Sequence, residues 1–92
     1  LKVDLPDLDS RLAILQVHNS DRPLAEEVDL PTWATQTEGW NGADLALLSN
    51  QAALEAIRRF RNQGQTDPAN IQISTDDFAT AFQLLSSQRQ SV

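Results

Sequence analysis

The fold is decided by the stretch Asn41-Gly-Ala-Asp-Leu-Ala-Leu-Leu-Ser-Asn-Gln-Ala-Ala-Leu-Glu-Ala-Ile-Arg-Arg59, which predicts the longest helix of the chain. Asn41 is a good N-cap, and Asp44 completes an arrangement like a capping box. One helical face carries apolar residues at three- and four-residue spacing: Leu45, Leu48, Ala52 and Ala56. A further set is expected to broaden this stripe: Leu47, Leu54 and Ile57. The helix should run from about Gly42 to Asn62 and stop near Gly64.

The residues before this stretch predict two shorter helices. Asp7 is suited to cap a first helix that runs to about Asn19. One face of that helix is expected to hold Leu8, Leu12, Leu15 and Asn19, and a neighbouring stripe to hold Ile14, Val17 and His18. A second helix should begin near Asp29, because its first turn tolerates Pro31. Gly39 can end it by adopting a left-handed conformation.

The residues after the long helix predict a loop, a short extended segment and a fourth helix. The loop covers residues 63–70, and Ile71-Gln-Ile73 is the extended segment. Ser74 and Asp77 form a capping box, followed by one apolar face: Phe78, Ala81, Phe82 and Leu85. The polar tail is expected to fray from Ser86 onward. Four helices with short connections predict an all-α fold, a small four-helix bundle.

Composition restricts the function more than it identifies it. The 92 residues carry 13 acidic and 7 basic side chains, a net charge of −6 that disfavours nucleic-acid binding. The absence of Cys and the single His make disulfides and a structural zinc site poor expectations. No apolar run approaches the length of a membrane span. We therefore expect a soluble, cytoplasmic domain, and the absence of Met even at position 1 is what an excised fragment would show.

No self-contained active site is predicted. The chain has no glycine-rich phosphate loop with a following Lys and Ser or Thr, and no apolar strand that ends in paired acids. No motif around any Ser supports a nucleophile with His18 as its base. The acidic pairs Glu26-Glu27 and Asp76-Asp77 are best explained as a solvated loop and a charged helix start.

Four segments in order resemble the C-terminal helical lid of AAA-type ATPases. They are Arg11-Leu-Ala-Ile-Leu-Gln-Val-His18, Pro23-Leu-Ala-Glu-Glu-Val-Asp-Leu30, Thr37-Glu-Gly-Trp-Asn-Gly-Ala-Asp-Leu45 and Ala52-Ala-Leu-Glu-Ala-Ile-Arg-Arg59. The resemblance covers about residues 1 to 85, with the valosin-containing-protein branch nearest in pattern. It implies a strand remnant of the large ATPase domain at residues 1–6, the lid at 7–86 and a polar tail at 87–92. Trp40 and Asn41 replace a Phe and a Ser that are common in that family.

The resemblance also implies a set of nucleotide-facing residues. His18 matches a family histidine that faces the adenosine, and Ile14 matches an aliphatic residue that packs on the base. Gly42 and Ala43 match the pair that lies against the adenine. The cofactor would be ATP, with its Mg²⁺ bound by the large domain. On pattern alone, however, His18 would simply be stabilised by a helix C-terminus, and Gly42 and Ala43 would be an ordinary helix start.

The implied parent is an ATP-hydrolysing protein that remodels or unfolds other proteins. Its lid would contact the missing large domain, neighbouring subunits of a homo-hexamer and, through the parent, protein substrates. Two alternatives stay open: the lid of an ATP-dependent membrane protease, and a free-standing helical interaction module without a nucleotide role. The basic cluster is either a solvated face or a contact with a neighbouring subunit: Arg58, Arg59 and Arg61. Trp33 is expected at the boundary of the core.

Overall fold

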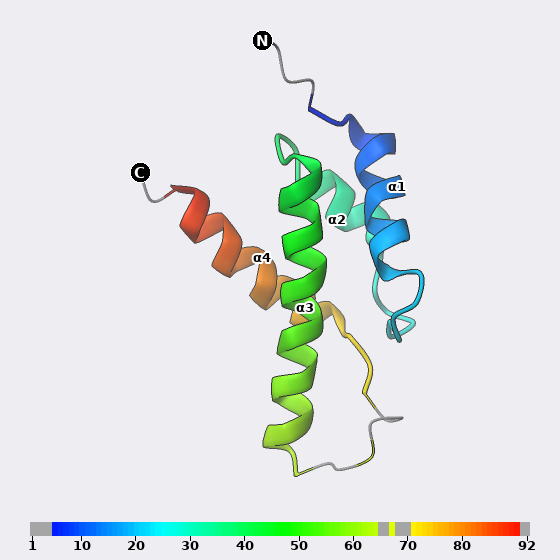
Figure 1. Ribbon diagram of the computed structural model, residues 1–92, viewed down its shortest axis with the longest axis vertical. Coiled ribbons are helices and arrows are strands. Elements are labelled where there is room, and N and C mark those ends of the chain that lie inside the picture. Colours follow the sequence, from blue (N-terminus) through cyan, green and yellow to red (C-terminus); the bar gives the residue numbers. More distant parts are fainter. Residues whose placement is uncertain (1–4, 65–66, 68–70, 91–92) are drawn as a thin grey trace.

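The computed structural model describes residues 5–64, 67 and 71–90, and in these ranges it contains four helices and no sheet (Figure 1). They are α1 (Leu8–Asn19), α2 (Leu30–Gln36), α3 (Gly42–Asn62) and α4 (Thr75–Gln90). This confirms the all-α, four-helix prediction. Residues 1–4, most of the expected N-terminal strand remnant, lie outside the described residues.

Local capping chemistry sets the helix boundaries. Asp7 accepts a hydrogen bond from the Ser10 N–H group at 2.9 Å and so caps α1. The predicted box at α3 is present, because Asn41 accepts from the Asp44 N–H at 2.8 Å and donates its own N–H to Asp44 at 3.2 Å. Two glycines with positive φ follow helices, Gly39 at 87° and Gly64 at 74°. The sequence predicted these boundaries because each depends on residues close together in the chain.

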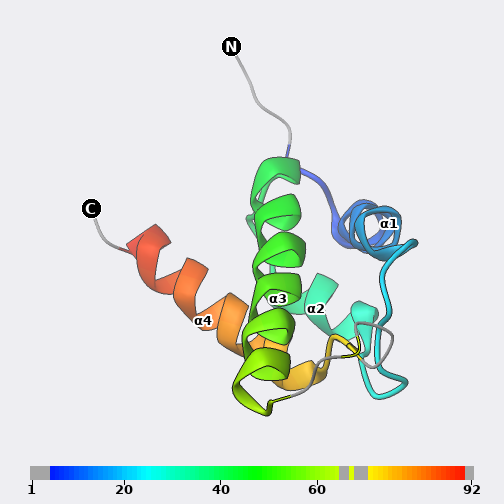
Figure 2. The same cartoon turned by 60° about the horizontal axis from the view of Figure 1, so that its bottom comes forward.

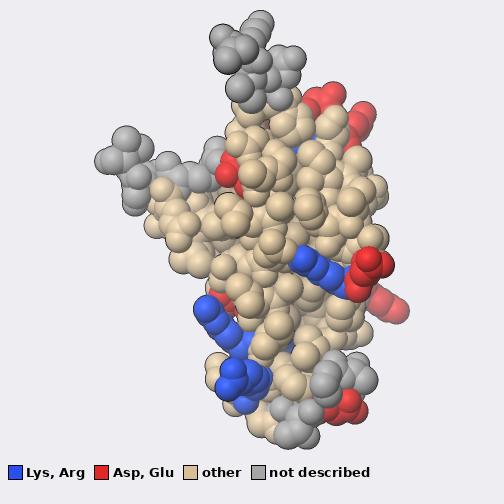
Figure 3. Space-filling view, viewed as in Figure 1, with Lys and Arg blue, Asp and Glu red and all other residues tan. Residues whose placement is uncertain are grey.

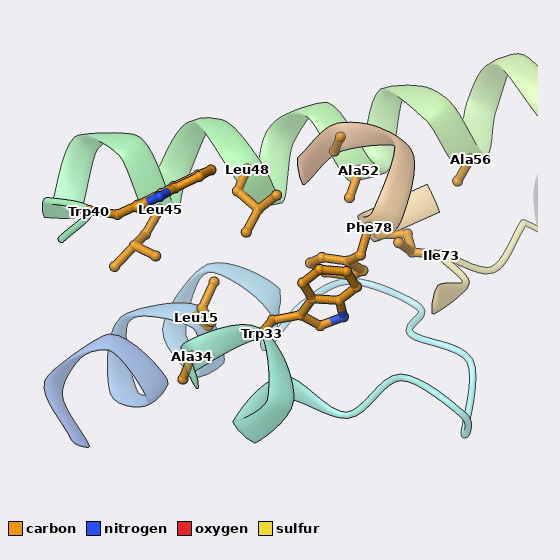
Figure 4. Close-up of a cluster of buried hydrophobic side chains, with 11 residues drawn as sticks. Leu15, Trp33, Ala34, Trp40, Leu45, Leu48, Ala52, Ala56, Ile73 and Phe78 are labelled. Atoms are coloured by element: carbon orange, nitrogen blue, oxygen red, sulfur yellow. The ribbon is translucent and has the colours of Figure 1, made fainter. Parts of the chain in front are cut away.

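Helix α3 is the centre of the domain and contacts both α1 and α4, while α2 packs on α1. Figure 2 shows α4 crossing behind α3, with α1 and α2 on its other side. The buried core gathers between these helices (Figure 4) and comprises Leu15, Trp33, Ala34, Trp40, Leu45, Leu48, Ala52, Ala56, Ile73, Phe78 and Ala81. The predicted face of α3 is therefore confirmed.

Aromatic rings connect α2 and the start of α3 to α4. The Trp33 ring stacks on Phe78, with the centroids 5.9 Å apart, and also contacts Phe82 at 5.7 Å. Trp40 stacks on the other side of this group, 5.4 Å from Phe82. Trp33 is 9% exposed, which confirms the expected core position.

The short extended segment is also present. Ile73 pairs with Leu24 as an isolated parallel bridge. The Ile73 N–H group donates to the Pro23 carbonyl at 2.8 Å, and the Ala25 N–H donates to the Ile73 carbonyl at 2.9 Å. These bonds hold the segment before α4 against the loop that joins α1 to α2.

Several side-chain predictions need correction. Leu47, Leu54 and Ile57 do not broaden the buried stripe, because they are 53%, 47% and 42% exposed. At about 100° of rotation per residue, Leu47 and Leu54 point away from the line through Leu45 and Leu48. Leu8 is also exposed, since it lies in the first turn of α1.

Two further differences from the sequence predictions concern α4 and α1. Helix α4 continues to Gln90, past Ser86, where its polar composition predicted fraying. In α1, the buried residue that the sequence did not indicate is Arg11, which shares a four-residue repeat with Leu15 and Asn19.

Candidate functional site

The first pair of predicted site residues, Ile14 and His18, lies together on α1. They are one helical turn apart and half-buried. With Ala13 and Val17 they line a shallow hollow of about 210 Å³. The pair occupies the flank of α1 next to its buried stripe, so its side chains stay accessible to a ligand or to another domain.

The second pair, Gly42 and Ala43, opens α3 immediately after its Asn41 cap. Gly42 is half-buried and Ala43 is exposed. A methyl group added at Gly42 would meet no atom of the chain within 4 Å, and the φ angle of Gly42 is not positive. Nothing inside the domain therefore requires a glycine at position 42.

The two pairs lie on helices that contact each other. The Asn19 side-chain amide donates to the Ser49 hydroxyl at 3.1 Å and to the Leu15 carbonyl at 2.8 Å, which fixes the C-terminal end of α1 against α3. Gly42 and Ala43 do not line the hollow beside Ile14 and His18. The chain thus places the four residues on neighbouring helices without joining them in one pocket of its own.

The basic cluster separates into residues with different surroundings. Arg59 forms an ion pair with Asp77, with Nη2 2.9 Å from Oδ2, and also donates to the Gln72 carbonyl at 2.8 Å. Arg58 pairs with Glu55 on its own helix at 3.1 Å and is exposed. Arg58 and Arg61 line a surface hollow together. The proposal of one solvated or partner-facing cluster is therefore wrong for Arg59, which serves the contact between α3 and α4.

The pKa of Asp77 is lowered in the folded chain. Burial would raise its pKa, but hydrogen bonds from Arg59 and Ser74 outweigh burial and hold the pKa below its ordinary value. The hydrogen bond to Asp77 likewise raises the pKa of Arg59. The sequence predicted Asp77 as a capping partner of Ser74 but did not predict its ion pair with Arg59, because these two residues are 18 positions apart in the chain.

An apolar groove that the sequence did not predict lies between α3 and the two paired segments around Pro23 and Ile73. It has a volume of about 520 Å³ and is lined by Arg22, Pro23, Asn50, Ala53, Leu54, Ile57, Ile71 and Ile73. It includes two of the exposed apolar side chains of α3, Leu54 and Ile57. Figure 3 shows a largely uncharged face here, with basic side chains over the C-terminal half of α3.

Two searches gave negative results within the described ranges. No group of three or more His, Asp or Glu side chains in them is arranged to hold a metal ion. None of the four helices, within the residues that the structure describes, has the length and apolar character needed to cross a membrane.

The middle of the chain matches a known protein family. Residues 27–71 match the family model described as the AAA+ lid domain. Together with the four-helix fold, this match identifies the chain as carrying the lid domain of an AAA ATPase.

The relatives give the particular proteins to which the chain is similar. It is 57% identical over 67 residues to the ATP-dependent zinc metalloprotease FtsH of Acidimicrobium ferrooxidans, a match that covers 73% of this chain and 10% of that protein. The FtsH of Leuconostoc mesenteroides is 49% identical over 74 residues, 80% of this chain and 10% of that protein. Protein SAV of Sulfolobus acidocaldarius is 38% identical over 92 residues, 89% of this chain and 12% of that protein.

The chain spans about a tenth of the length of the FtsH relatives that it matches. The comparisons thus confirm the expected AAA lid. They do not show the finer expectation of the valosin-containing-protein branch, since the FtsH name recurs among the relatives.

Proposed function

We propose that this chain is the lid of an ATP-hydrolysing AAA protein and supplies part of the wall around the adenine of ATP. The supporting observation is the match of residues 27–71 to the AAA+ lid model. The large ATPase domain of the parent would bind the phosphates and Mg²⁺ and carry out hydrolysis. The lid would turn as a rigid body when the nucleotide state changes, within a homo-hexameric assembly.

The site residues fit the edge and face of a purine. Ile14 offers an aliphatic surface beside the His18 imidazole, which can exchange a hydrogen bond with a nucleoside. Gly42 leaves open space where a side chain would stand, so backbone can approach a flat ring closely. Because the fold does not require this glycine, a contact outside the chain is the better explanation for it. Ala43 adds a small apolar surface next to Gly42.

The proposal predicts that His18→Ala and Gly42→Ala weaken nucleotide binding by the parent protein. Losing one hydrogen bond or one close backbone contact should reduce affinity by about two- to tenfold. Titration with a fluorescent ATP analogue measures this, and circular dichroism checks the fold. Gln16→Ala, an exposed position on the same helix, is the matched control. Affinity equal to that of the control in both variants would remove these residues from the site.

Two activities of the parent agree with a lid. The sequence favoured a remodelling or unfolding ATPase, whereas relatives named ATP-dependent zinc metalloprotease favour the protease alternative. We therefore give the protease equal standing as a proposal. A zinc-binding motif in the sequence that follows the lid in the parent would decide for the protease. The free-standing module would require that no phosphate-binding loop precedes the lid.

The partners follow from the same proposal. The apolar groove on α3 and the exposed Arg58 and Arg61 are surfaces suited to contacts with the large domain or with a neighbouring subunit. Protein substrates would be partners of the parent rather than of this domain. The expected cytoplasmic location stays a prediction.

A further inference from the structure

Arg11 is a buried cation that joins three parts of the chain. Its side chain projects from α1 and is 7% exposed. Nε donates to the Ala34 carbonyl of α2 at 2.8 Å. Nη1 donates to the carbonyl of Pro6, which precedes α1, at 3.0 Å. One guanidinium therefore connects the segment leading into α1 with the last turn of α2.

Among the residues that the structure describes, Arg11 is held by neutral backbone carbonyl groups and not by a carboxylate. Neither ion pair found within the described residues includes Arg11, and both of its hydrogen-bonded acceptors are backbone carbonyls. Asp7 is close enough for the Arg11 charge to lower its pKa, after the larger effect of the hydrogen bonds from Ser10. The Ala34 carbonyl lies in the last turn of α2, where the helix dipole favours a cation. A planar guanidinium can reach two separate carbonyls at once, which a lysine ammonium does poorly.

The segment held by Arg11 is fixed by other bonds as well. The Arg11 N–H group donates to the Asp7 carbonyl at 2.8 Å, and the Asp7 side chain caps α1 through Ser10. The ring of Pro6 restricts its own φ angle. Backbone, cap and guanidinium therefore all hold Pro6 and Asp7 in one orientation relative to α1.

We infer that Arg11 fastens Pro6 and Asp7 to α1 and α2, so that this segment and the first two helices keep one orientation when the lid turns. The turning motion rests on the proposed lid function, while the attachment itself does not. Arg11 is in this sense a positioning residue for the chain that enters the lid, and it does not line the hollow beside Ile14 and His18.

The attachment can be tested by spin labelling of the 92-residue chain, which contains no Cys of its own. Labels at Leu5→Cys and Glu38→Cys, two exposed positions, report the lead-in segment against the end of α2. Pulsed electron paramagnetic resonance should give one narrow distance. Arg11→Met and Arg11→Lys should each broaden it roughly twofold, because neither side chain reaches both carbonyls. A second label pair, Gln16→Cys with Leu47→Cys, reports α1 against α3 and should be unchanged in both variants.

Three results would overturn the inference. The first is a broad Leu5-to-Glu38 distribution with Arg11 intact. The second is a Leu5-to-Glu38 distance distribution that stays narrow in an Arg11 variant whose Gln16-to-Leu47 distance is unchanged. The third is loss of the control distance in both variants, since Arg11 would then be needed for folding as a whole rather than for this orientation.

The parent protein separates this inference from the proposed nucleotide site. Arg11→Lys should lower the nucleotide-dependent change in the distance between lid and large domain, while leaving ATP affinity within about twofold of the wild type. His18→Ala should lower the ATP affinity and leave the nucleotide-dependent distance change as in the wild type. An Arg11→Lys variant with reduced affinity and an unchanged distance response would contradict the role of Arg11 and leave the nucleotide site standing.

Discussion

Asp77 connects two helices through a single carboxylate. It accepts from Arg59 of α3 at 2.9 Å and from the Ser74 N–H group at 2.9 Å, at the start of its own helix α4. Its side chain is 6% exposed, whereas that of Arg59 is 41% exposed. The Arg59 end is therefore screened by water, and the capping hydrogen bonds are the better protected part of this cluster.

Asp77→Asn should lower the free energy of unfolding of the chain by about 1–3 kcal/mol, because the charge-assisted bonds to Arg59 and Ser74 are lost. Urea unfolding followed by circular dichroism measures this. The exposed neighbour Asp76 offers the matched variant Asp76→Asn, which should change stability by less than about 0.5 kcal/mol. Equal losses in the two variants would contradict the role given to Asp77.

The same carboxylate predicts a pH dependence with a defined sign. The pKa of Asp77 is lower in the folded chain than its ordinary value, so the unfolded chain takes up the proton first. Its contribution is complete above the unfolded pKa of about 4 and is lost as the pH falls through the lower folded pKa. The difference in stability between wild type and Asp77→Asn should therefore shrink on acidification.

At the scale of the helices, the sequence predicted what depends on near neighbours. The Asn41 and Asp44 box and the glycines at 39 and 64 were all identified, because capping is decided within a few residues. The faces were predicted less well. Leu54 was assigned to the core by its hydrophobicity, although helical rotation turns it away from Leu45 and Leu48. The width of the buried stripe depends on how α1 and α4 pack on α3, and hydrophobicity alone does not contain that information.

Long-range contacts of charged side chains were not predictable for the same reason. Arg11 resembles any exposed helical arginine in sequence, and its carbonyl acceptor in α2 lies 23 residues away. Of the candidate site, the proximity of Ile14 and His18 followed from helical spacing, whereas the nucleotide role came only from the family resemblance. Only the structure showed that Gly42 and Ala43 lie on a helix that contacts α1 and that they do not line the hollow beside His18.

Two glycines at helix boundaries provide a matched prediction. Gly39→Ala should destabilise the chain by about 1–2 kcal/mol, because alanine is strained at the φ of 87° that follows α2. Gly42→Ala should be neutral or stabilise by up to about 1 kcal/mol, since its φ is not positive and an added methyl group meets no neighbour. Thermal unfolding of both variants measures the contrast, and a larger loss at Gly42 would mean that the start of α3 is packed more tightly than described.

At the scale of the whole molecule, the four proposed site residues do not enclose a pocket within the domain. The hollow beside His18 is shallow, and Gly42 and Ala43 stand outside it. The apolar groove on α3 likewise has exposed side chains in its lining, Leu54 and Ile57. Open surfaces of this kind are expected on a domain that forms a binding site together with a second domain.

The isolated chain should therefore bind ATP too weakly for calorimetry, with a Kd above about 1 mM, and should not hydrolyse it. Isothermal titration with Mg²⁺ and ATP, together with a phosphate-release assay, measures both. The proposed division of labour would be refuted by phosphate release from the purified chain above that of a His18→Ala, Gly42→Ala control.

The stacked rings between α2, α3 and α4 also make the chain its own optical reporter. It contains no Tyr, so its near-ultraviolet absorption and emission come chiefly from Trp33 and Trp40. Both indoles contact Phe82, and Trp33 also contacts Phe78, so the environment of each depends on α4 staying in place. Detachment of α4 alone would shift the emission of both before the helical content of α1 and α3 changed. Emission and far-ultraviolet dichroism recorded on one sample would thus show whether the last helix comes away separately or with the rest.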